Sequence, residues 1–110
     1  MKEILVVSAG DLPGQRITEV LGLVRGNAVR ARHIGRDILA LFRNIVGGEV
    51  LEYRKLMAES REQALDQMLD EARELDADAV ISVRMTTSMI GQGMAEILVY
   101  GTAVRVEKAT

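Results

Sequence analysis

The sequence predicts an α+β fold with the element order β-β-α-α-β-β, in which an antiparallel sheet carries helices on one face. Two short runs rich in β-branched residues stand at each end of the chain, and the middle repeats its apolar residues at helical spacing. Glycine-containing turns separate several of these segments. Because the chain has 110 residues and no linker-like stretch, residues 1–110 are expected to form a single domain.

The N-terminal part of the chain predicts two strands. The first is the apolar run 4–7, which is followed by turn-forming residues 8–14 that include the only proline, Pro13. The second covers 17–25, where β-branched residues alternate loosely. The short connection makes an antiparallel hairpin the simplest way to join these two strands.

The middle of the chain predicts two helices. The apolar residues of the first recur at helical spacing and are Ile34, Ile38, Leu41, Phe42 and Ile45. Gly47 and Gly48 are expected to end it, because glycine readily takes the left-handed conformation of a helix C-cap. A longer helix is expected over 49–75, where Glu49 and Glu52 suit the positive end of the helix dipole. Its apolar stripe comprises Val50, Tyr53, Met57, Ala64, Met68, Ala72 and Leu75.

Two further strands are expected over 79–87 and 94–106, joined by a hairpin turn at 91–93. Gly101, inside the final strand, indicates a bulge or a close backbone approach. This strand is apolar on both of its faces, with Ile97 and Val99 on one side and Leu98, Tyr100 and Val104 on the other. A strand with one face open to water normally has polar residues on that face. We therefore expect either that helices and a partner cover the two faces, or that this strand is central in an assembly.

Several runs of residues resemble the YbjQ-like family, whose members carry a heavy-metal-binding label. The matching residues are Gly26, Arg36-Asp37, Arg43-Asn44-Ile45-Val46-Gly47-Gly48, Tyr53, Ala77-Asp78-Ala79-Val80 and Gly101-Thr102-Ala103-Val104. The resemblance spans residues 17–106 and implies a small α+β subunit that assembles into a ring, a pentamer, without implying an established activity. The family usually has glycine where this chain has Asp76, which can take the left-handed cap at some cost in strain.

Composition excludes several classes of function. The net charge of −2 is too small to favour nucleic acid or an anionic membrane as a partner. The absence of cysteine removes disulfides, thiolate ligands and a cysteine nucleophile. No apolar run approaches the roughly 20 residues that span a bilayer. The apolar run near the start of the chain is too short for the apolar region of a signal peptide. We expect a cytoplasmic protein.

A basic cluster spans the second strand, the following loop and the first predicted helix. It comprises Arg25, Arg30, Arg32, His33, Arg36 and Arg43, with Asp37 as its acidic member. Guanidinium groups and helix N-terminal amides bind phosphate and other anions. The candidate ligand-binding residues are therefore Arg32, His33, Arg36, Asp37 and Arg43. The simpler interpretation, which carries more weight, is a solvated surface or an interface with acidic residues of a neighbour.

The second predicted helix carries an acidic ridge, Glu62, Asp66, Asp70 and Glu74, at i,i+4 spacing. The favoured interpretation is a solvated face relieved by Arg61 and Arg73; pairing with arginines of another subunit and binding of Ca²⁺ or Mg²⁺ are the alternatives. A soft-metal site has poor ligands, since His33 is the only histidine. The methionines at 85, 89 and 94 suit flexible packing better than Cu(I). No metal ligand is assigned, and the cofactor is unknown.

No catalytic residues are assigned, because no serine stands in a recognisable His–Asp arrangement and no phosphate-cradling loop joins a strand to a helix. The leading hypothesis is a non-enzymatic, ring-forming oligomer that binds an unidentified ligand or partner. One alternative is a metal-binding protein. A second is an enzyme or binder that acts on a phosphorylated small molecule through the basic cluster between Arg25 and Arg43.

Overall fold

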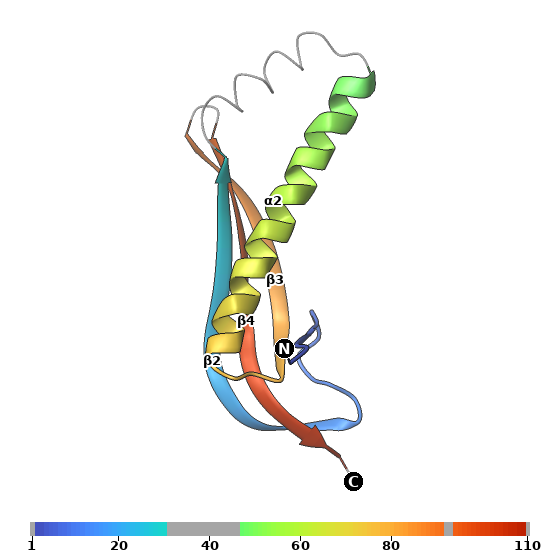
Figure 1. The fold of residues 1–110 in the computed structure, drawn as a ribbon, viewed down its shortest axis with the longest axis vertical. Helices are drawn as coiled ribbons and strands as arrows, with labels where there is room; N and C mark the ends of the chain where they lie inside the picture. Colours follow the sequence, from blue (N-terminus) through green and yellow to red (C-terminus); the bar gives the residue numbers. More distant parts are fainter. Residues whose placement is uncertain (1, 31–46, 92–93, 110) are drawn as a thin grey trace.

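The computed structural model describes residues 2–30, 47–91 and 94–109. In chain order these form β1 (Leu5–Val6), β2 (Gln15–Arg30), α2 (Gly47–Glu74), β3 (Ala79–Gly91) and β4 (Met94–Lys108), an α+β arrangement (Figure 1). The first predicted helix lies outside the described residues. The two glycines expected to end it, Gly47 and Gly48, instead belong to α2, which begins at Gly47.

The sheet is mixed and not wholly antiparallel as predicted, with the strand order β1-β3-β4-β2. β1 runs parallel to β3, whereas β4 is antiparallel to both β3 and β2. The predicted hairpin between the first two strands is therefore wrong, since β1 and β2 lie at opposite edges. The amide of Leu5 donates to Asp78 O at 3.3 Å and that of Val7 to Val80 O at 3.0 Å. These long-range bonds to β3 decide the position of β1, and loop length alone did not indicate them.

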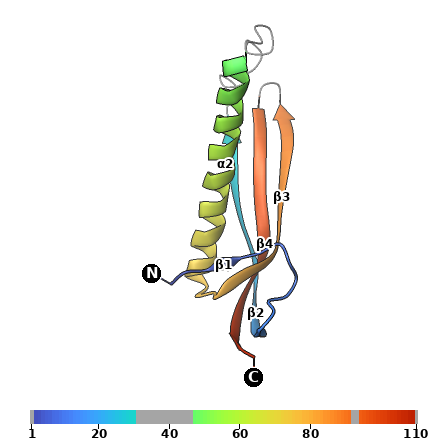
Figure 2. The same cartoon turned by 90° about the vertical axis from the view of Figure 1, so that its right-hand side faces the viewer.

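The predicted hairpin of the last two strands is confirmed, because β3 and β4 pair antiparallel up to Gly91 and Met94. Both strands are longer than expected. β2 also continues beyond its predicted end at residue 25, as far as Arg30. The fold therefore has one long antiparallel three-stranded body, with the short β1 added across its base (Figure 2).

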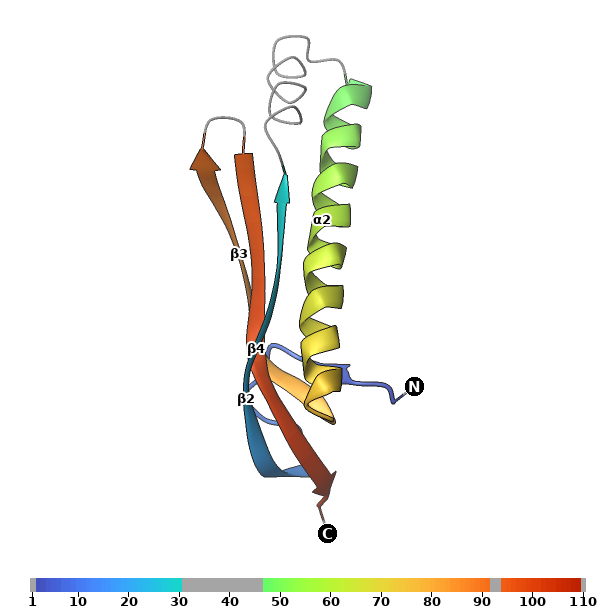
Figure 3. The same ribbon diagram turned by 60° about the vertical axis from the view of Figure 1, so that its left-hand side comes forward.

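One helix, α2, covers one face of this sheet and lies over β2 and β4 (Figure 3). Three members of its predicted stripe, Ala64, Met68 and Ala72, are fully buried and Met57 is half-buried, but Leu75 is exposed. They pack on residues of β2 and β4 that include Val24, Ile97 and Val99. The side chains of Val50 and Tyr53 lie outside the described part. Among the described residues, no helix is long and apolar enough to span a membrane.

A second, smaller core lies on the opposite face, at the base of the sheet. Leu12 packs there with Ala79, Ile81 and Val104, and partly buried neighbours surround them. Ile97 and Val99 thus face the first core, while Val104 faces the second. At this end of the sheet the second apolar side of the final strand is covered by residues of the same chain, and cover by a partner subunit stays a prediction.

Two backbone features match their sequence-based expectations. Gly101 lies opposite a bulge in β3 between Ile81 and Arg84, and an added Cβ at this position would be 2.7 Å from Val80 Cγ1. Asp76 takes the left-handed conformation with φ 58°. The amides of Asp76 and Ala77 donate to the carbonyl oxygens of Arg73 and Ala72, both at 3.0 Å, which is the hydrogen-bond pattern of a Schellman cap.

The molecule is elongated, with principal extents of 58 × 24 × 24 Å and a radius of gyration of 17.4 Å. A compact domain of this length has a radius of gyration of about 13 Å. The accessible surface area is 7420 Å², whereas a folded monomer of this mass exposes about 6,000 Å². The chain therefore exposes about 1,400 Å² more than a typical monomer of its mass.

Candidate functional site

The candidate site is the sheet face turned away from α2, which we call the outer face. Its apolar residues are Val20, Leu23 and Val29 of β2 and Leu98 and Tyr100 of β4, as the strand register shows. Val20 is 67% exposed, Leu23 63% and Val29 45%. None of the described elements covers this upper part of the face. Exposed apolar side chains on this face stand among polar ones, since Arg25 and Asn27 of β2 share its parity with Leu23 and Val29.

Polar groups border the apolar residues of the outer face. Arg84 donates to the carbonyl oxygens of Ser8 and Val83, both at 2.9 Å, and this holds its guanidinium beside the N-terminal segment. Asn27 donates to Glu96 at 3.1 Å, which links β2 to β4. Arg25, a member of the predicted basic cluster, lies opposite Tyr100. The outer face therefore combines exposed apolar side chains with interleaved polar groups.

The outward edge of β2 is closed by side chains of α2. The backbone amide of Arg25 donates to Glu71 Oε1 at 3.1 Å, and that of Asn27 donates to Gln67 Oε1 at 3.0 Å. The two acceptors stand one helical turn apart, which matches the two-residue repeat of the strand. Sequence reasoning missed this contact. Its only signal was that Gln67 and Glu71 share the helix face next to the apolar stripe.

An ionic cluster ties the N-terminus to the base of the fold. Lys2 Nζ lies 2.5 Å from Asp78 Oδ1, and Asp78 Oδ2 accepts from the amide of Val106 at 2.9 Å. The hydrogen bond from Lys2, and then that from Val106, lower the pKa of Asp78. The same hydrogen bond, which Lys2 donates to Asp78, is the main reason why the pKa of Lys2 is raised. Because its charges satisfy each other, this cluster has a structural role.

Arg105 extends this ionic cluster across the sheet. Its guanidinium contacts Asp76 at 3.0 Å and Glu19 at 3.8 Å. Arg105 thus links β4 to the helix cap through its hydrogen bond to Asp76, with Glu19 of the edge strand β2 nearby. The cap at Asp76 is thus held by a side-chain contact in addition to its backbone hydrogen bonds.

The five predicted ligand-binding residues all lie outside the described part of the chain. They are Arg32, His33, Arg36, Asp37 and Arg43. Whether they come together therefore stays a prediction. Of the wider basic cluster, Arg25 and the backbone of Arg30 belong to β2. The register places Arg25 on the outer face, opposite Tyr100.

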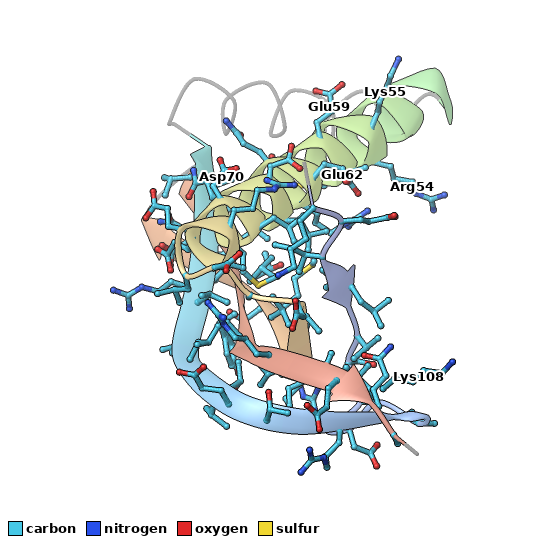
Figure 4. The ribbon with its side chains drawn as sticks, turned by 60° about the horizontal axis from the view of Figure 1, so that its bottom comes forward. Arg54, Lys55, Glu59, Glu62, Asp70 and Lys108 are labelled. Carbon is cyan, nitrogen blue, oxygen red and sulfur yellow. The ribbon has the colours of Figure 1, made fainter. Side chains whose placement is uncertain are left out.

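The acidic ridge is exposed along α2, and Figure 4 shows two of its members, Glu62 and Asp70, on the helix together with the further acidic residue Glu59. Asp70 pairs with Arg73 at 2.9 Å, in agreement with the interpretation as a solvated face relieved by arginine. Within residues 2–30, 47–91 and 94–109, no three His, Cys, Asp or Glu side chains are grouped so that they could hold a metal ion. The described ridge thus provides no ready cation site.

Comparison with known proteins gives a consistent family assignment. A family model described as "Putative heavy-metal-binding", of the YbjQ type, matches residues 4–107. A UPF0145 protein of Pyrococcus furiosus is 56% identical over 108 residues, covering 98% of this chain and 95% of the relative. A UPF0145 protein of Thermus thermophilus is 53% identical over 107 residues, covering 97% and 94%.

A solved structure resembles the fold. It is the crystal structure of a protein of unknown function from Pediococcus pentosaceus, of the DUF74 family, with a TM-score of 0.64. It is 13% identical in sequence, and the match covers 94% of this chain and 98% of the other. At that identity the similarity concerns the fold alone. Together, the family model and the close relatives show that this chain belongs to the YbjQ-like family of UPF0145 proteins.

Proposed function

We propose that this protein is a ring-forming oligomeric module, a pentamer, which binds an unidentified ligand or protein partner and catalyses no reaction. The observation that carries this proposal is the exposed apolar outer face, with Val20, Leu23 and Val29 in the open. Burying such surface against another subunit stabilises the assembly by about 25 cal/mol per Å². In keeping with the absence of cysteine, we place the protein in the cytoplasm.

The size of the accessible surface supports self-association. The 7420 Å² of the chain exceeds the value typical of a monomer of its mass by about 1,400 Å². Each partner in a standard interface buries about 800 Å². A subunit of a ring makes two such contacts, so that the excess corresponds to the area that a ring would remove from solvent.

Native mass spectrometry of the untagged protein, purified without chelator, tests the proposal directly. A mass of five subunits is the expected result. A chain that stays monomeric at micromolar concentration would contradict the assembly, and another subunit number would correct the ring size. Additional mass on any species would reveal a bound ligand or metal.

A substitution at Leu23 tests whether the outer face is the contact surface. Leu23→Glu places a carboxylate among the exposed apolar side chains of the outer face and is expected to weaken assembly at least tenfold, since 1.4 kcal/mol already corresponds to that factor. Leu75→Glu is the matched control, because Leu75 is an exposed leucine at the end of α2 and away from the outer face. Equal effects of the two variants on the subunit number would remove the outer face from the proposal.

Metal binding is the second candidate, favoured by the description of the family. Calorimetry with Cu(I), Zn²⁺ and Ni²⁺ tests it, and micromolar binding at a fixed ratio to the subunit would make it the leading function. A thermal-shift panel of phosphate and nucleotides tests the remaining hypothesis, that the basic cluster between Arg25 and Arg43 holds a phosphorylated small molecule. If neither the calorimetry nor the thermal-shift panel detects binding, a role in protein assembly is the remaining hypothesis.

A further inference from the structure

A groove of about 430 Å³ lies beside the outward edge of β2, where α2 runs alongside this strand (Figure 3). β2, α2 and β4 all contribute side chains to its wall. These side chains are Arg25, Asn27, Gln67, Glu71, Glu96 and Leu98. Pockets that bind small molecules typically have volumes of about 300–1,000 Å³. The groove is therefore large enough for a small organic ligand.

Three polar side chains of the groove are each held in place through one atom. Glu71 Oε1 accepts from the backbone amide of Arg25 at 3.1 Å. Gln67 Oε1 and Glu96 Oε2 both accept from Asn27, from its backbone amide at 3.0 Å and from its side-chain amide at 3.1 Å. The second polar atoms of these side chains form no hydrogen bond to another described residue, and they are Glu71 Oε2, Gln67 Nε2 and Glu96 Oε1. The groove thus offers two carboxylates and an amide that are positioned before a ligand binds.

The charges in the groove do not neutralise one another. Glu71 and Glu96 are its two acids, and Arg25 is the one base among the lining residues. Among the ion pairs between described residues, none includes any of these three side chains. The groove therefore carries two negative groups and one positive group. A complementary ligand has one negative group and two positive ones.

The two carboxylates approach the groove from different faces of the sheet. Glu71 extends from α2, which covers one face, whereas Glu96 shares the parity of Leu98 on the outer face. A metal ion needs several ligands that converge on one point, and no three His, Cys, Asp or Glu side chains of the described residues are grouped in that way. The separation instead suits two cationic groups that are joined by a short chain.

We propose that this groove binds a free basic amino acid. Its α-carboxylate pairs with the guanidinium of Arg25, because arginine recognises carboxylates through two parallel hydrogen bonds. Its two cationic groups pair with Glu71 and Glu96, and its methylene chain lies against the half-buried Leu98. This inference rests on the part of the proposed function that assigns a ligand to the protein, and it names the class of that ligand.

The same charges argue against a phosphorylated ligand in this groove. Glu71 and Glu96 repel an anion, so the surroundings of Arg25 favour a carboxylate that is accompanied by positive groups. The groove therefore differs in its ligand from the predicted basic cluster, although Arg25 belongs to both.

Isothermal titration calorimetry of the full chain with L-lysine and L-arginine tests the inference. Both amino acids are expected to bind at one molecule per subunit. L-Glutamate lacks the second positive group and cadaverine lacks the carboxylate, so each is expected to bind roughly tenfold or more weakly. Failure of both basic amino acids to bind, or equal binding by cadaverine, would overturn the inference. Binding of Mg²⁺ in place of the amino acids would also overturn it.

Two lysine derivatives distinguish a free amino acid from the end of a peptide. Nα-acetyl-L-lysine lacks the α-ammonium group, as a C-terminal residue does, and L-lysine amide lacks the carboxylate, as an N-terminal residue does. Both are expected to bind roughly tenfold or more weakly than L-lysine. Equal or tighter binding of either derivative would assign the groove to a peptide terminus and overturn the inference.

Substitutions in the groove provide an independent test. Arg25→Gln and Glu96→Gln are each expected to lower the affinity for L-lysine roughly tenfold or more, and Glu96→Gln keeps an acceptor oxygen for Asn27. Arg16→Gln and Glu107→Gln are the matched controls, because they remove an exposed ion pair of β2 and β4 outside the groove. Unchanged affinity in both groove variants would overturn the inference. If Arg25→Gln does not fold, Glu96→Gln decides alone.

Native mass spectrometry of the same samples separates this inference from the assembly. An oligomer that binds neither basic amino acid would overturn the inference and leave the proposed assembly standing. A monomer that binds one molecule per chain would contradict the assembly and support the groove as the ligand site, since all of its lining residues belong to one chain.

Discussion

At Gly26 the absence of a side chain sets the distance between helix and sheet. A Cβ there would lie 2.0 Å from the carbonyl oxygen of Ala64 and 2.7 Å from the amide nitrogen of Met68. Both are backbone atoms, so no side-chain rotation could make room. The close approach of α2 also brings Glu71 and Gln67 within reach of the β2 edge. One glycine therefore determines both the packing of the core and the closure of an edge.

Gly26→Ala is expected to destabilise the fold by about 1–3 kcal/mol, since the helix must move away from β2. Urea denaturation followed by circular dichroism measures the change. Gly10→Ala is the control, because its Cβ would meet only Ser82 Oγ, at 3.7 Å, an ordinary contact. A Gly26→Ala variant as stable as this control would show that α2 can shift without loss.

The lowered pKa of Asp78 predicts a dependence of stability on pH. A carboxyl whose pKa is lower in the folded than in the unfolded state stabilises the fold above its unfolded value, 3.8, and loses this contribution as the pH falls through the folded value. Asp78→Asn should therefore be less stable than the parent at pH 7, and the gap should narrow below pH 3.8. Thermal unfolding from pH 7 to pH 2 measures this, with Asp66→Asn as an exposed control. A gap that does not change with pH would contradict the role of the Lys2–Asp78 pair.

At the level of elements, the two long edges of the sheet are treated differently. β2 is closed by a helix that lies beside it, whereas the upper part of β3 is open. With this asymmetry, the two edges of the sheet cannot pair with another strand in the same way. It follows from the position of α2, which lies over β2 and β4 and leaves β3 bare.

Glu71→Ala is expected to destabilise the fold by about 0.5–1.5 kcal/mol, because the amide of Arg25 loses its acceptor. A hydrogen bond to water compensates for part of this loss. Glu71→Gln keeps an acceptor oxygen and should restore most of the stability. Denaturant titration of the three proteins measures this, and light scattering at high concentration detects pairing at the opened edge. If the glutamine variant were no more stable than the alanine variant, the hydrogen bond would not be the cause.

Local patterns predicted α2 and the β3–β4 hairpin well. The helix was expected over 49–75 and is Gly47–Glu74, because its apolar spacing is regular and its C-cap is formed by neighbours in sequence. The position of β1 was missed, since it depends on Asp78 and Val80, more than 70 residues away. The apolar outer face was indicated by the two-sided pattern of β4, but the closure of β2 by Gln67 and Glu71 depends on a tertiary approach that no local pattern records.

At the level of the whole molecule, the narrow, elongated form places nearly every element close to a surface. The extents of 58 × 24 × 24 Å leave room for one helix layer and one sheet layer. Such a shape has a small interior, so a large share of the apolar side chains reaches solvent unless subunits meet. The proposed assembly would therefore add stability that the isolated subunit lacks.

The response of the assembly to salt distinguishes two kinds of subunit contact. If the apolar outer face is the main contact, the oligomer should persist at about 1 M salt, because screening at that concentration weakens only ionic contacts. Size-exclusion chromatography with light scattering at low and high salt measures this. Dissociation at high salt would instead favour pairing between the acidic ridge of α2 and arginines of a neighbouring subunit.

The strand order has a consequence for how the chain folds as it is made. Each pair of neighbouring strands includes β3 or β4, and Leu5 pairs with Ala79 while Gln15 pairs with Lys108. The first two strands therefore remain without a place in the sheet until residues beyond 79 have been synthesised. Pairing across such long sequence separations slows folding. During this time the unpaired apolar strands can be bound by chaperones or by other nascent chains on the same messenger RNA.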